Sequence, residues 1–282
     1  MICSPRVSHA LAVFAKKAGR GINRFDMIRD GDRILIGVSG GKDSLALCAA
    51  LSERKRWVPI DYSLSAAIID WREYPAQPEA LEALRGFLDG LAIPLKVIPA
   101  HIYPQGYRKA FSCYICSRNR KRILFGEAER LGASKVALGH HLDDIVETTL
   151  LNLFFRGEFS TMMPVQRFFG GKLAIIRPLC EVEESDVERL ARRYPLPVIA
   201  GSCPRKHINQ RLILKEILRG LRRVNRQVKE NIYRAAWNIN TEYLPSGPRP
   251  GAARKPAAAQ PAARKPAAAQ PAPSGPDLPP PG

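Results

Sequence analysis

The chain has 282 residues, which is enough for one large or two small domains with a buried core. Its 44 lysine and arginine residues outnumber 26 aspartate and glutamate residues, and the net charge of +18 favours polyanionic partners, nucleic acid above all. No apolar run approaches the length of a membrane span and no segment has the pattern of an export signal, so the sequence predicts a cytoplasmic protein with no membrane partner.

The first predicted elements are a short basic helix over 8–18 and, after a turn at 30–32, a strand over Ile34–Val38. The strand is apolar and rich in β-branched residues, as expected when both of its faces are buried. It ends at a pair of glycines, and an amphipathic helix over about 44–54 follows. This order indicates an anion site, because the first N–H groups of a helix and its positive dipole end face the ligand.

The glycine turn is a candidate phosphate-binding loop. It consists of Ser39, Gly40, Gly41, Lys42, Asp43 and Ser44. The glycines allow the backbone to approach a ligand closely, Lys42 adds a cation and Ser44 adds a hydroxyl. A Walker A loop needs a glycine where Lys42 stands, and a dinucleotide fingerprint needs a third glycine that is missing here. The motif resembles instead the PP-loop of the ATP pyrophosphatases, which cleave ATP between its α and β phosphates and adenylate a substrate.

The remaining chain alternates strands with helices. Further strands are expected at 62–69, 95–98, 135–138, 175–176 and 197–199, and further helices from residue 78, over 117–131 and over 143–155. This alternation predicts an α/β protein with a doubly wound parallel sheet. Ligands of such sheets bind at the carboxyl ends of the strands, where the phosphate loop, Asp70 and Gly139 would lie.

Cysteine usage favours a reducing compartment, because six cysteines in a chain of this size show no regular framework spacing. Cys113 and Cys116 stand two residues apart before a predicted helix, and such a pair can chelate a metal ion or cluster or form a redox disulfide. Cys203 offers a third thiolate in a turn. Structural zinc would need a fourth ligand, for which His207 is the nearest candidate. An iron–sulfur cubane held by three cysteines would leave one iron open.

A third motif runs from Gly139 to Asp144, between a predicted strand and a predicted helix. Gly139 permits a close backbone approach. Asp143 and Asp144 lie in the first helical turn, where carboxylates complement the helix dipole, and capping alone would account for them. Beside a phosphate site, an aspartate can instead hold Mg²⁺ that bridges the phosphates of ATP.

The C-terminal part changes character twice. Residues 205–234 are strongly basic and indicate either a solvated helix face or, as we favour, a surface that contacts a phosphate backbone. Proline, alanine and glycine dominate the end of the chain, where Ala253–Ala262 is repeated as Ala263–Ala272, so this tail is expected to be disordered. The predicted organisation is an N-terminal helical segment (1–30), a PP-loop domain (31–221), a basic helical extension (222–244) and a disordered tail (245–282).

Taken in order, the motifs resemble those of the TtcA-type tRNA 2-thiocytidine synthetases. The matching positions are Ser39–Ser44, Cys113 and Cys116 followed by Ser117–Lys121, Gly139–Asp144, Arg177–Leu179, and Cys203 before Gln210 and Arg211. The resemblance covers about residues 15–220. Members often carry one more cysteine, three residues before the one that matches Cys203, and this position is Ala200 here. The zinc modules of the related 2-thiouridine enzymes are absent from the sequence.

The resemblance implies a reaction in two steps. ATP, bound with Mg²⁺, adenylates the C2 oxygen of a pyrimidine, cytidine in preference to uridine, and pyrophosphate is released. Sulfide carried on the open iron of a [4Fe–4S] cluster then displaces AMP. The implied partners are tRNA, a sulfur donor such as a cysteine desulfurase, and a second copy of the chain in a homodimer.

The resemblance also implies a role for each site residue. Lys42 would neutralise phosphate charge, while Asp43 and Asp143 would hold or position Mg²⁺. Arg120 or Lys121 would stabilise charge that develops near the base. The implied nucleotide-binding residues are Ser39, Gly40, Gly41, Lys42, Asp43, Ser44, Ile69, Asp70, Gly139 and Asp144, and the implied cluster ligands are Cys113, Cys116 and Cys203.

Other functions remain open at this point. A tRNA(Ile)-lysidine synthetase-like ligase adenylates the same atom but has no use for the three cysteines, and a 2-thiouridine synthetase uses the same chemistry on another base. A non-catalytic nucleotide-binding regulator with structural zinc represents a different class. Metal analysis of anaerobically purified protein separates these functions, because they predict about four iron atoms per chain, zinc alone, or neither.

Overall fold

The computed structural model describes residues 5–103, 113–199 and 209–245. These residues belong to two units, Met1–Ile239 and Asn240–Gly282. In the second unit, the described part contains the 3₁₀ turn η2 (Thr241–Tyr243), and from residue 246 on the predicted tail lies outside the described residues. None of the helices in the described ranges is long and apolar enough to cross a membrane.

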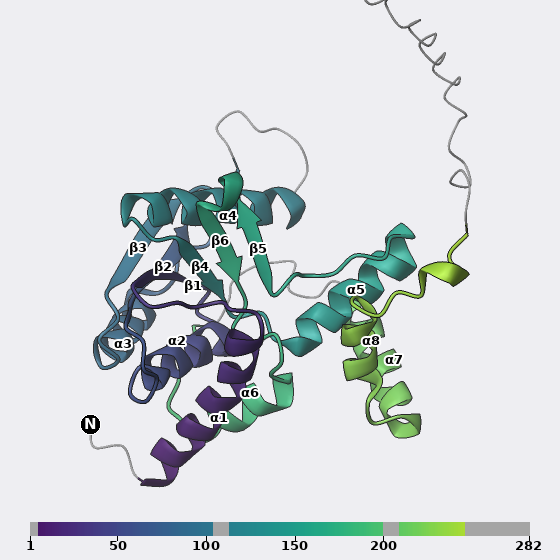
Figure 1. Cartoon of the computed structure of the whole chain (residues 1–282). Helices are drawn as coiled ribbons and strands as arrows, with labels where there is room; N and C mark the ends of the chain where they lie inside the picture. The colour runs from purple at the N-terminus through teal and green to yellow at the C-terminus, as the bar shows by residue number, and fades with distance from the viewer. Residues whose placement is uncertain (1–4, 104–112, 200–208, 246–282) are drawn as a thin grey trace, which may run out of the picture. The chain divides into compact units, whose positions relative to one another are not determined.

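The first unit is built on a six-stranded sheet with the strand order β3-β2-β1-β4-β6-β5 (Figure 1). The strands are β1 (Asp32–Val38), β2 (Tyr62–Trp71), β3 (Leu95–Ala100), β4 (Lys135–Leu138), β5 (Val165–Phe168) and β6 (Leu173–Ile176). All neighbouring strands pair in parallel except β5, which is antiparallel to β6 at one edge. The predicted doubly wound α/β fold is confirmed. Because the chain continues from β1 to β2 on one side and reaches β4 on the other, a ligand crevice is expected at the carboxyl end of β1.

Helices cover both faces of the sheet (Figure 1). They are α1 (Pro5–Arg24), α2 (Lys42–Arg54), α3 (Pro78–Asp89), α4 (Cys113–Arg130), α5 (Leu142–Arg156), α6 (Glu184–Ala191), α7 (Asn209–Val224) and α8 (Val228–Ala235), and the 3₁₀ turn η1 (Phe169–Gly171) follows β5. On one face, Leu124 and Ala128 of α4 pack with Leu35 and Val136 of the sheet. On the other face, α1, α2, α3 and α6 enclose the larger core.

The N-terminal helix differs from the prediction, because α1 extends beyond the range 8–18 at both ends. Its apolar stripe, which includes Phe14, Ala18 and Ile22, is buried in the same core as α2. Tertiary packing of this stripe stabilises the helix through Gly19 and Gly21, beyond the predicted end at residue 18. The described residues of the predicted segment 1–30 therefore belong to the same compact unit as the PP-loop domain.

The sixth predicted strand is wrong. Residues 197–199 form no strand, because Pro197 has no N–H to donate to a ladder. Ile199 instead donates a single backbone hydrogen bond to Gly40 O at 2.9 Å, which ties this segment to the phosphate loop. The sheet edge is formed by β5, which is too short to give a recognisable alternation of apolar and polar residues.

The described part of the predicted basic segment (205–234) forms two helices, α7 and α8, and both contact α5. Leu214 and Leu218 on α7 and Tyr233 on α8 are buried. The predicted domain boundary at 221/222 falls inside α7, so the basic extension begins within the same unit as the PP-loop domain.

Candidate active site

A cavity of about 580 Å³ lies at the carboxyl ends of β1, β2, β4 and β6. Its lining draws on segments that are far apart in the sequence and that the fold brings to one end of the sheet. The predicted site residues in this lining are Ser39, Asp43, Ser44, Ile69, Asp70, Cys116, Arg120, Lys121, Gly139 and Asp144.

The loop after β1 forms a cradle suited to phosphate. Gly40 has a φ of +79°, a left-handed conformation that side chains rarely adopt. Ser44 Oγ donates to Gly41 O at 2.9 Å and accepts from Ser39 N at 3.2 Å, so hydroxyl groups fix the loop from within. Gly41 caps α2 without a side-chain hydrogen bond, and the N–H groups of the first turn can therefore serve an anion.

The turn between β4 and α5 lies directly against this loop. A Cβ atom at Gly139 would lie 2.9 Å from the backbone carbon of Asp43 and 2.9 Å from the backbone nitrogen of Ser44. These are backbone atoms, which cannot move aside unless the loop itself shifts. Gly139 is therefore required for the fit between the two motifs.

Gly139→Ala should lower both stability and ATP affinity. Overpacking of a tight contact costs about 1–3 kcal/mol, and we expect a decrease of that size in the free energy of unfolding, together with weaker ATP binding because the loop shifts. Gly86→Ala is the matched control, since Gly86 is exposed in α3 with open space around a Cβ, and alanine should stabilise that helix by up to about 1 kcal/mol. Chemical denaturation and calorimetric ATP titration measure both effects. Equal behaviour of the two variants would contradict the close contact.

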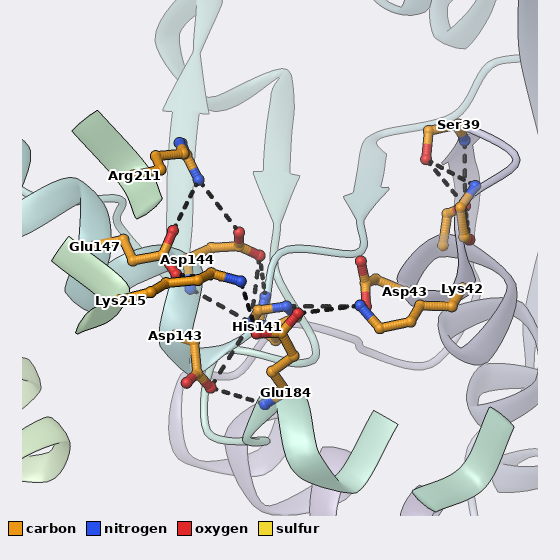
Figure 2. Close-up of polar contacts among 12 residues, drawn as sticks. Ser39, Lys42, Asp43, His141, Asp143, Asp144, Glu147, Glu184, Arg211 and Lys215 are labelled. Carbon is orange, nitrogen blue, oxygen red and sulfur yellow. Dashed lines mark hydrogen bonds and ion pairs between the residues drawn. The ribbon is translucent and has the colours of Figure 1, made fainter. Parts of the chain in front are cut away.

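Lys42 is held by a carboxylate from outside the loop (Figure 2). Its Nζ lies 3.2 Å from Asp43 Oδ1 and 3.2 Å from Glu184 Oε1 on α6. Burial opposes the charge on Lys42, but the two carboxylates outweigh it and raise the pKa of Lys42 above its usual value. Lys42 is therefore a cation at neutral pH, at the start of the helix that presents the phosphate cradle.

Glu184 connects the loop with α7. Its second oxygen accepts a hydrogen bond from Lys215 Nζ at 3.0 Å. Burial would raise the pKa of Glu184, but the hydrogen bonds and charges of Lys215 and Lys42 lower it to about 2. Lys215 and Arg211 also pair with the buried Glu147 of α5, at 3.7 and 3.2 Å. Alternating charges thus link the basic helix α7 to the PP-loop.

The two adjacent aspartates at the start of α5 have different surroundings (Figure 2). Asp143 is buried, accepts from the N–H of Glu184 at 2.7 Å and forms a close ion pair with Lys229 of α8. Both of its carboxylate oxygens are thus engaged within the protein, so this geometry does not support the predicted contact of Asp143 with Mg²⁺. Asp144 lines the cavity and forms a capping box with His141.

Asp43 presents an oxygen that suits a cation. Its Oδ1 is buried and lies 3.2 Å from Lys42 Nζ and 3.8 Å from His141 Nε2, but no described residue donates a hydrogen bond of regular geometry to it. Buried carboxylate oxygens are normally satisfied, and a hard cation would satisfy this one. Asp43 and Asp144 thus offer carboxylate ligands of the kind that Mg²⁺ prefers beside phosphates.

Another wall of the cavity comes from α4. Asn119 anchors this helix, because its Nδ2 donates to the backbone oxygens of His101 and Ile102 at 2.8 and 3.1 Å. Arg120 and Lys121 follow Asn119 and line the cavity. The two predicted base-side cations are therefore on the same rigid element and open into the same space as the phosphate loop.

The cysteine prediction is only partly within the described structure. Cys116 lines the cavity from α4. Cys113 begins the same helix, but its side chain is not described, and Cys203 and the alternative zinc ligand His207 lie outside the described residues. Among the side chains that are described, no three histidine, cysteine or acidic groups come together as a metal site.

Three residues at the site had no role assigned from the sequence: Glu184, His140 and Arg177. The acidic stretch 181–186 in an otherwise basic chain was the available signal for Glu184. His140 and Arg177 belong to recognised motifs, and both line the cavity. Their convergence follows from the neighbouring positions of β4 and β6, which only the fold reveals.

The sequence matches the family model of the PP-loop domain over residues 12–218. A tRNA-cytidine(32) 2-sulfurtransferase of Geobacter sulfurreducens is 39% identical over 230 residues, covering 80% of this chain and 89% of the relative. One of Alkalilimnicola ehrlichii is 36% identical over 234 residues, covering 80% of this chain and 73% of the relative.

Among solved structures, the U34-tRNA thiolase NcsA from Methanococcus maripaludis, with its [4Fe–4S] cluster, has a TM-score of 0.64 at 22% identity. The alignment covers 79% of this chain and 77% of that chain, and it shows a common fold. From the sequence matches it follows that the chain belongs to the PP-loop family and, within it, to the family of the tRNA-cytidine(32) 2-sulfurtransferases.

Proposed function

We propose that this chain uses ATP to thiolate a cytidine in tRNA, the reaction for which its sequence relatives are named. The observation that carries the proposal is one shared cavity, because Asp43 of the phosphate loop and Cys116 of α4 line the same space. Adenylation of the C2 oxygen and replacement of that oxygen by sulfur occur in succession at one carbonyl group, so the groups that perform them must open onto one position of the substrate.

The phosphate loop is suited to the adenylation step. The loop amides and Lys42 bind the phosphates of ATP, with adenosine placed toward Ile69 and Asp70 at the end of β2. Asp43 and Asp144 would hold Mg²⁺, which neutralises charge on the departing pyrophosphate. The C2 oxygen of the cytosine attacks the α phosphorus, the bond from that phosphorus to the bridging oxygen breaks, and pyrophosphate leaves.

We assign the sulfur-transfer step to the three predicted cluster cysteines. Cys113, Cys116 and Cys203 would hold a [4Fe–4S] cluster, which supplies sulfide from its open iron. The placement of Cys116 in the cavity lining fits this assignment. Arg120 and Lys121 stabilise the negative charge of the phosphate as the C2–O bond breaks and AMP departs. The sulfur would come from an external donor such as a cysteine desulfurase.

Reconstitution tests the proposed function. Anaerobically reconstituted protein, given ATP, Mg²⁺, sulfide and tRNA, should form 2-thiocytidine that mass spectrometry detects in nuclease digests of the tRNA. The same protein should contain about four iron atoms per chain. Appearance of 2-thiouridine alone would reassign the target base. A lysidine product, or zinc with no iron, would refute the thiolation.

Neutralising the unpaired cations near the end of α7 should weaken tRNA binding. Arg219, Arg223 and Arg226 are exposed and form no ion pair within the described ranges, whereas Arg222 pairs with Glu183 at 3.4 Å. Each lost phosphate contact reduces the logarithmic salt slope by about 0.7–0.9, so replacing the three arginines by glutamine should flatten it by roughly 2–3 units. Filter-binding titrations at several salt concentrations measure the slope.

Truncation after Leu244 is the comparison for this variant. It removes a tail in which prolines separate the cations, so the tail can add affinity but cannot fix a register on the tRNA. We expect a mild loss of affinity and no change in the modified position. If truncation abolished modification and the triple arginine variant bound normally, the tail would be the recognition element.

A further inference from the structure

Two polar side chains lie on the side of the cavity away from the expected adenosine position. His140 follows β4 and Arg177 follows β6, and both line the cavity. These strands are neighbours, whereas Ile69 and Asp70 belong to β2 on the other side of β1. A second substrate that reaches the phosphate cradle from the β4 and β6 side would therefore contact both His140 and Arg177.

Each of these side chains has a buried nitrogen without a hydrogen-bond partner among the described residues. Arg177 donates from one terminal nitrogen to Met163 O, which orients the guanidinium, but its Nε is unpartnered. His140 Nδ1 is unpartnered as well. Seven buried side-chain atoms lack a partner among the described residues, and three of them, on Asp43, His140 and Arg177, belong to residues that line this one cavity. Buried polar atoms in folded proteins are nearly always paired, so a ligand in the cavity is the partner that would satisfy these three. The adenylation and sulfur-transfer steps described above use neither His140 nor Arg177.

The two groups differ in hydrogen-bonding character. Burial and the positive charge of Arg177 lower the pKa of His140 to about 4, so the imidazole is neutral at physiological pH and offers an acceptor nitrogen. Burial lowers the pKa of Arg177 to about 10, which still leaves a cation, and a guanidinium can only donate. A donor and an acceptor therefore follow two neighbouring strands, β6 and β4, and line the same cavity.

We propose that Arg177 and His140 together recognise the base edge of the target cytosine, an inference that rests on the proposed thiolation of cytidine. Arg177 donates to ring nitrogen N3, and His140 accepts from the amino group at position 4. Uracil presents the reverse pattern, a donor at N3 and an acceptor at position 4. Its N3–H would meet the donor Arg177 and its oxygen at position 4 would meet the acceptor nitrogen of His140, so neither hydrogen bond could form.

This contact also directs the adenylation to one atom. N3 is the most basic atom of the cytosine ring and would compete with O2 for the α phosphorus. A hydrogen bond from Arg177 occupies the lone pair of N3 and leaves O2 as the available nucleophile. Met162 and Ile175, which line the cavity with His140 and Arg177, supply apolar surface for the flat faces of the base.

The test compares RNAs that carry cytidine or uridine at the modified position. Stem-loop binding, measured by fluorescence anisotropy, and kcat/KM for thiolation of the full tRNA should both favour cytidine in the wild-type protein. His140→Leu and Arg177→Met should each reduce the preference by roughly 10- to 100-fold, the value of a good base contact, without a change in ATP affinity or iron content. His140→Gln retains an acceptor oxygen and should keep most of the preference. His9→Leu is the matched control, because His9 is exposed on α1 and is not part of the cavity lining.

Failure of this inference is distinguishable from failure of the proposed function. If the wild-type protein thiolates cytidine while His140→Leu and Arg177→Met keep the full preference, another part of the protein reads the base and the inference is wrong. If the wild-type protein thiolates neither tRNA, the proposed function is refuted and the inference with it. Circular dichroism identifies an unfolded variant, and should one of the two substitutions unfold the chain, the other gives the decisive comparison.

Discussion

Lys42→Ala and Asp43→Ala should each lower tRNA-dependent AMP release by at least about 100-fold, the usual cost of removing one group that stabilises charge in a transition state. Lys42 is a cation beside the phosphate cradle, and Asp43 presents its under-coordinated buried oxygen there. Both act on phosphates and not on sulfur, so the iron content should equal that of the wild-type protein. Chromatographic measurement of AMP and iron analysis of the same samples test both statements.

A second lysine–aspartate pair provides the matched control. Lys55 and Asp61 lie 3.4 Å apart and outside the cavity lining, and Asp61 is almost fully exposed. Lys55→Ala and Asp61→Ala should release AMP at the wild-type rate, because an exposed pair of this kind contributes little to stability and nothing to the site. Undiminished AMP release by Lys42→Ala would mean that the PP-loop is not the ATP site.

Replacing Cys113, Cys116 or Cys203 by serine should abolish thiolation and remove most of the iron. Thiolates hold iron–sulfur clusters, and three ligands leave no substitute when one of them is lost. The phosphate loop is untouched by these changes, so ATP should bind with wild-type affinity. Iron analysis, visible absorbance and mass spectrometry of digested tRNA measure the three effects.

Two other cysteines serve as controls for the ligand set. Cys48 and Cys180 are buried in the core, and burial raises the pKa of each thiol to about 12, so neither supplies a thiolate at neutral pH. Cys48→Ala and Cys180→Ala remove these thiols without burying a hydroxyl, and both variants should keep their iron. A full iron content in Cys203→Ser would exclude that residue from the ligands.

Two kinds of site residue could be predicted from the sequence. Some lie together in one continuous motif, and others are placed by the rule that ligands bind at the carboxyl ends of parallel strands. Ser39–Ser44 contain a strand end, a glycine turn and a helix start, and the structure places the loop where that order predicts it. Asp70 and Gly139 follow from the rule that parallel strands present their carboxyl ends on one edge. Both residues line the cavity beside the loop.

The sequence could not predict which of two adjacent aspartates on α5 reaches the cavity, because this depends on the rotation of the helix. Asp143 and Asp144 are adjacent and chemically identical, but successive residues of an α-helix point about 100° apart. Asp144 lines the cavity, whereas Asp143 pairs with Lys229 of α8. Which of the two aspartates reaches the cavity depends on how α5 is rotated against the elements packed around it, and no local pattern encodes that rotation.

Contacts between distant segments explain the other differences between the sequence prediction and the structure. The ion pair between Lys42 and Glu184 joins the first and last thirds of the PP-loop domain, and no pattern in the sequence indicates that these two residues pair. The 197–199 segment is apolar and ends in two β-branched residues, as a strand would, yet the N–H of Ile199 donates to the loop oxygen of Gly40 and not to a neighbouring strand. In both cases the partner, and not the local residue pattern, determines the structure.

Counting pyrophosphate and 2-thiocytidine in the same single-turnover reaction tests most directly whether ATP activation and sulfur transfer occur in one cavity. We expect equal amounts of the two products from the wild-type protein and neither product from Lys42→Ala. Cys116→Ser should release pyrophosphate but form no 2-thiocytidine, because the phosphate loop remains intact while the sulfur-carrying site is lost. Thiolation by Cys116→Ser at the wild-type level, or thiolation by Lys42→Ala without pyrophosphate, would contradict this account.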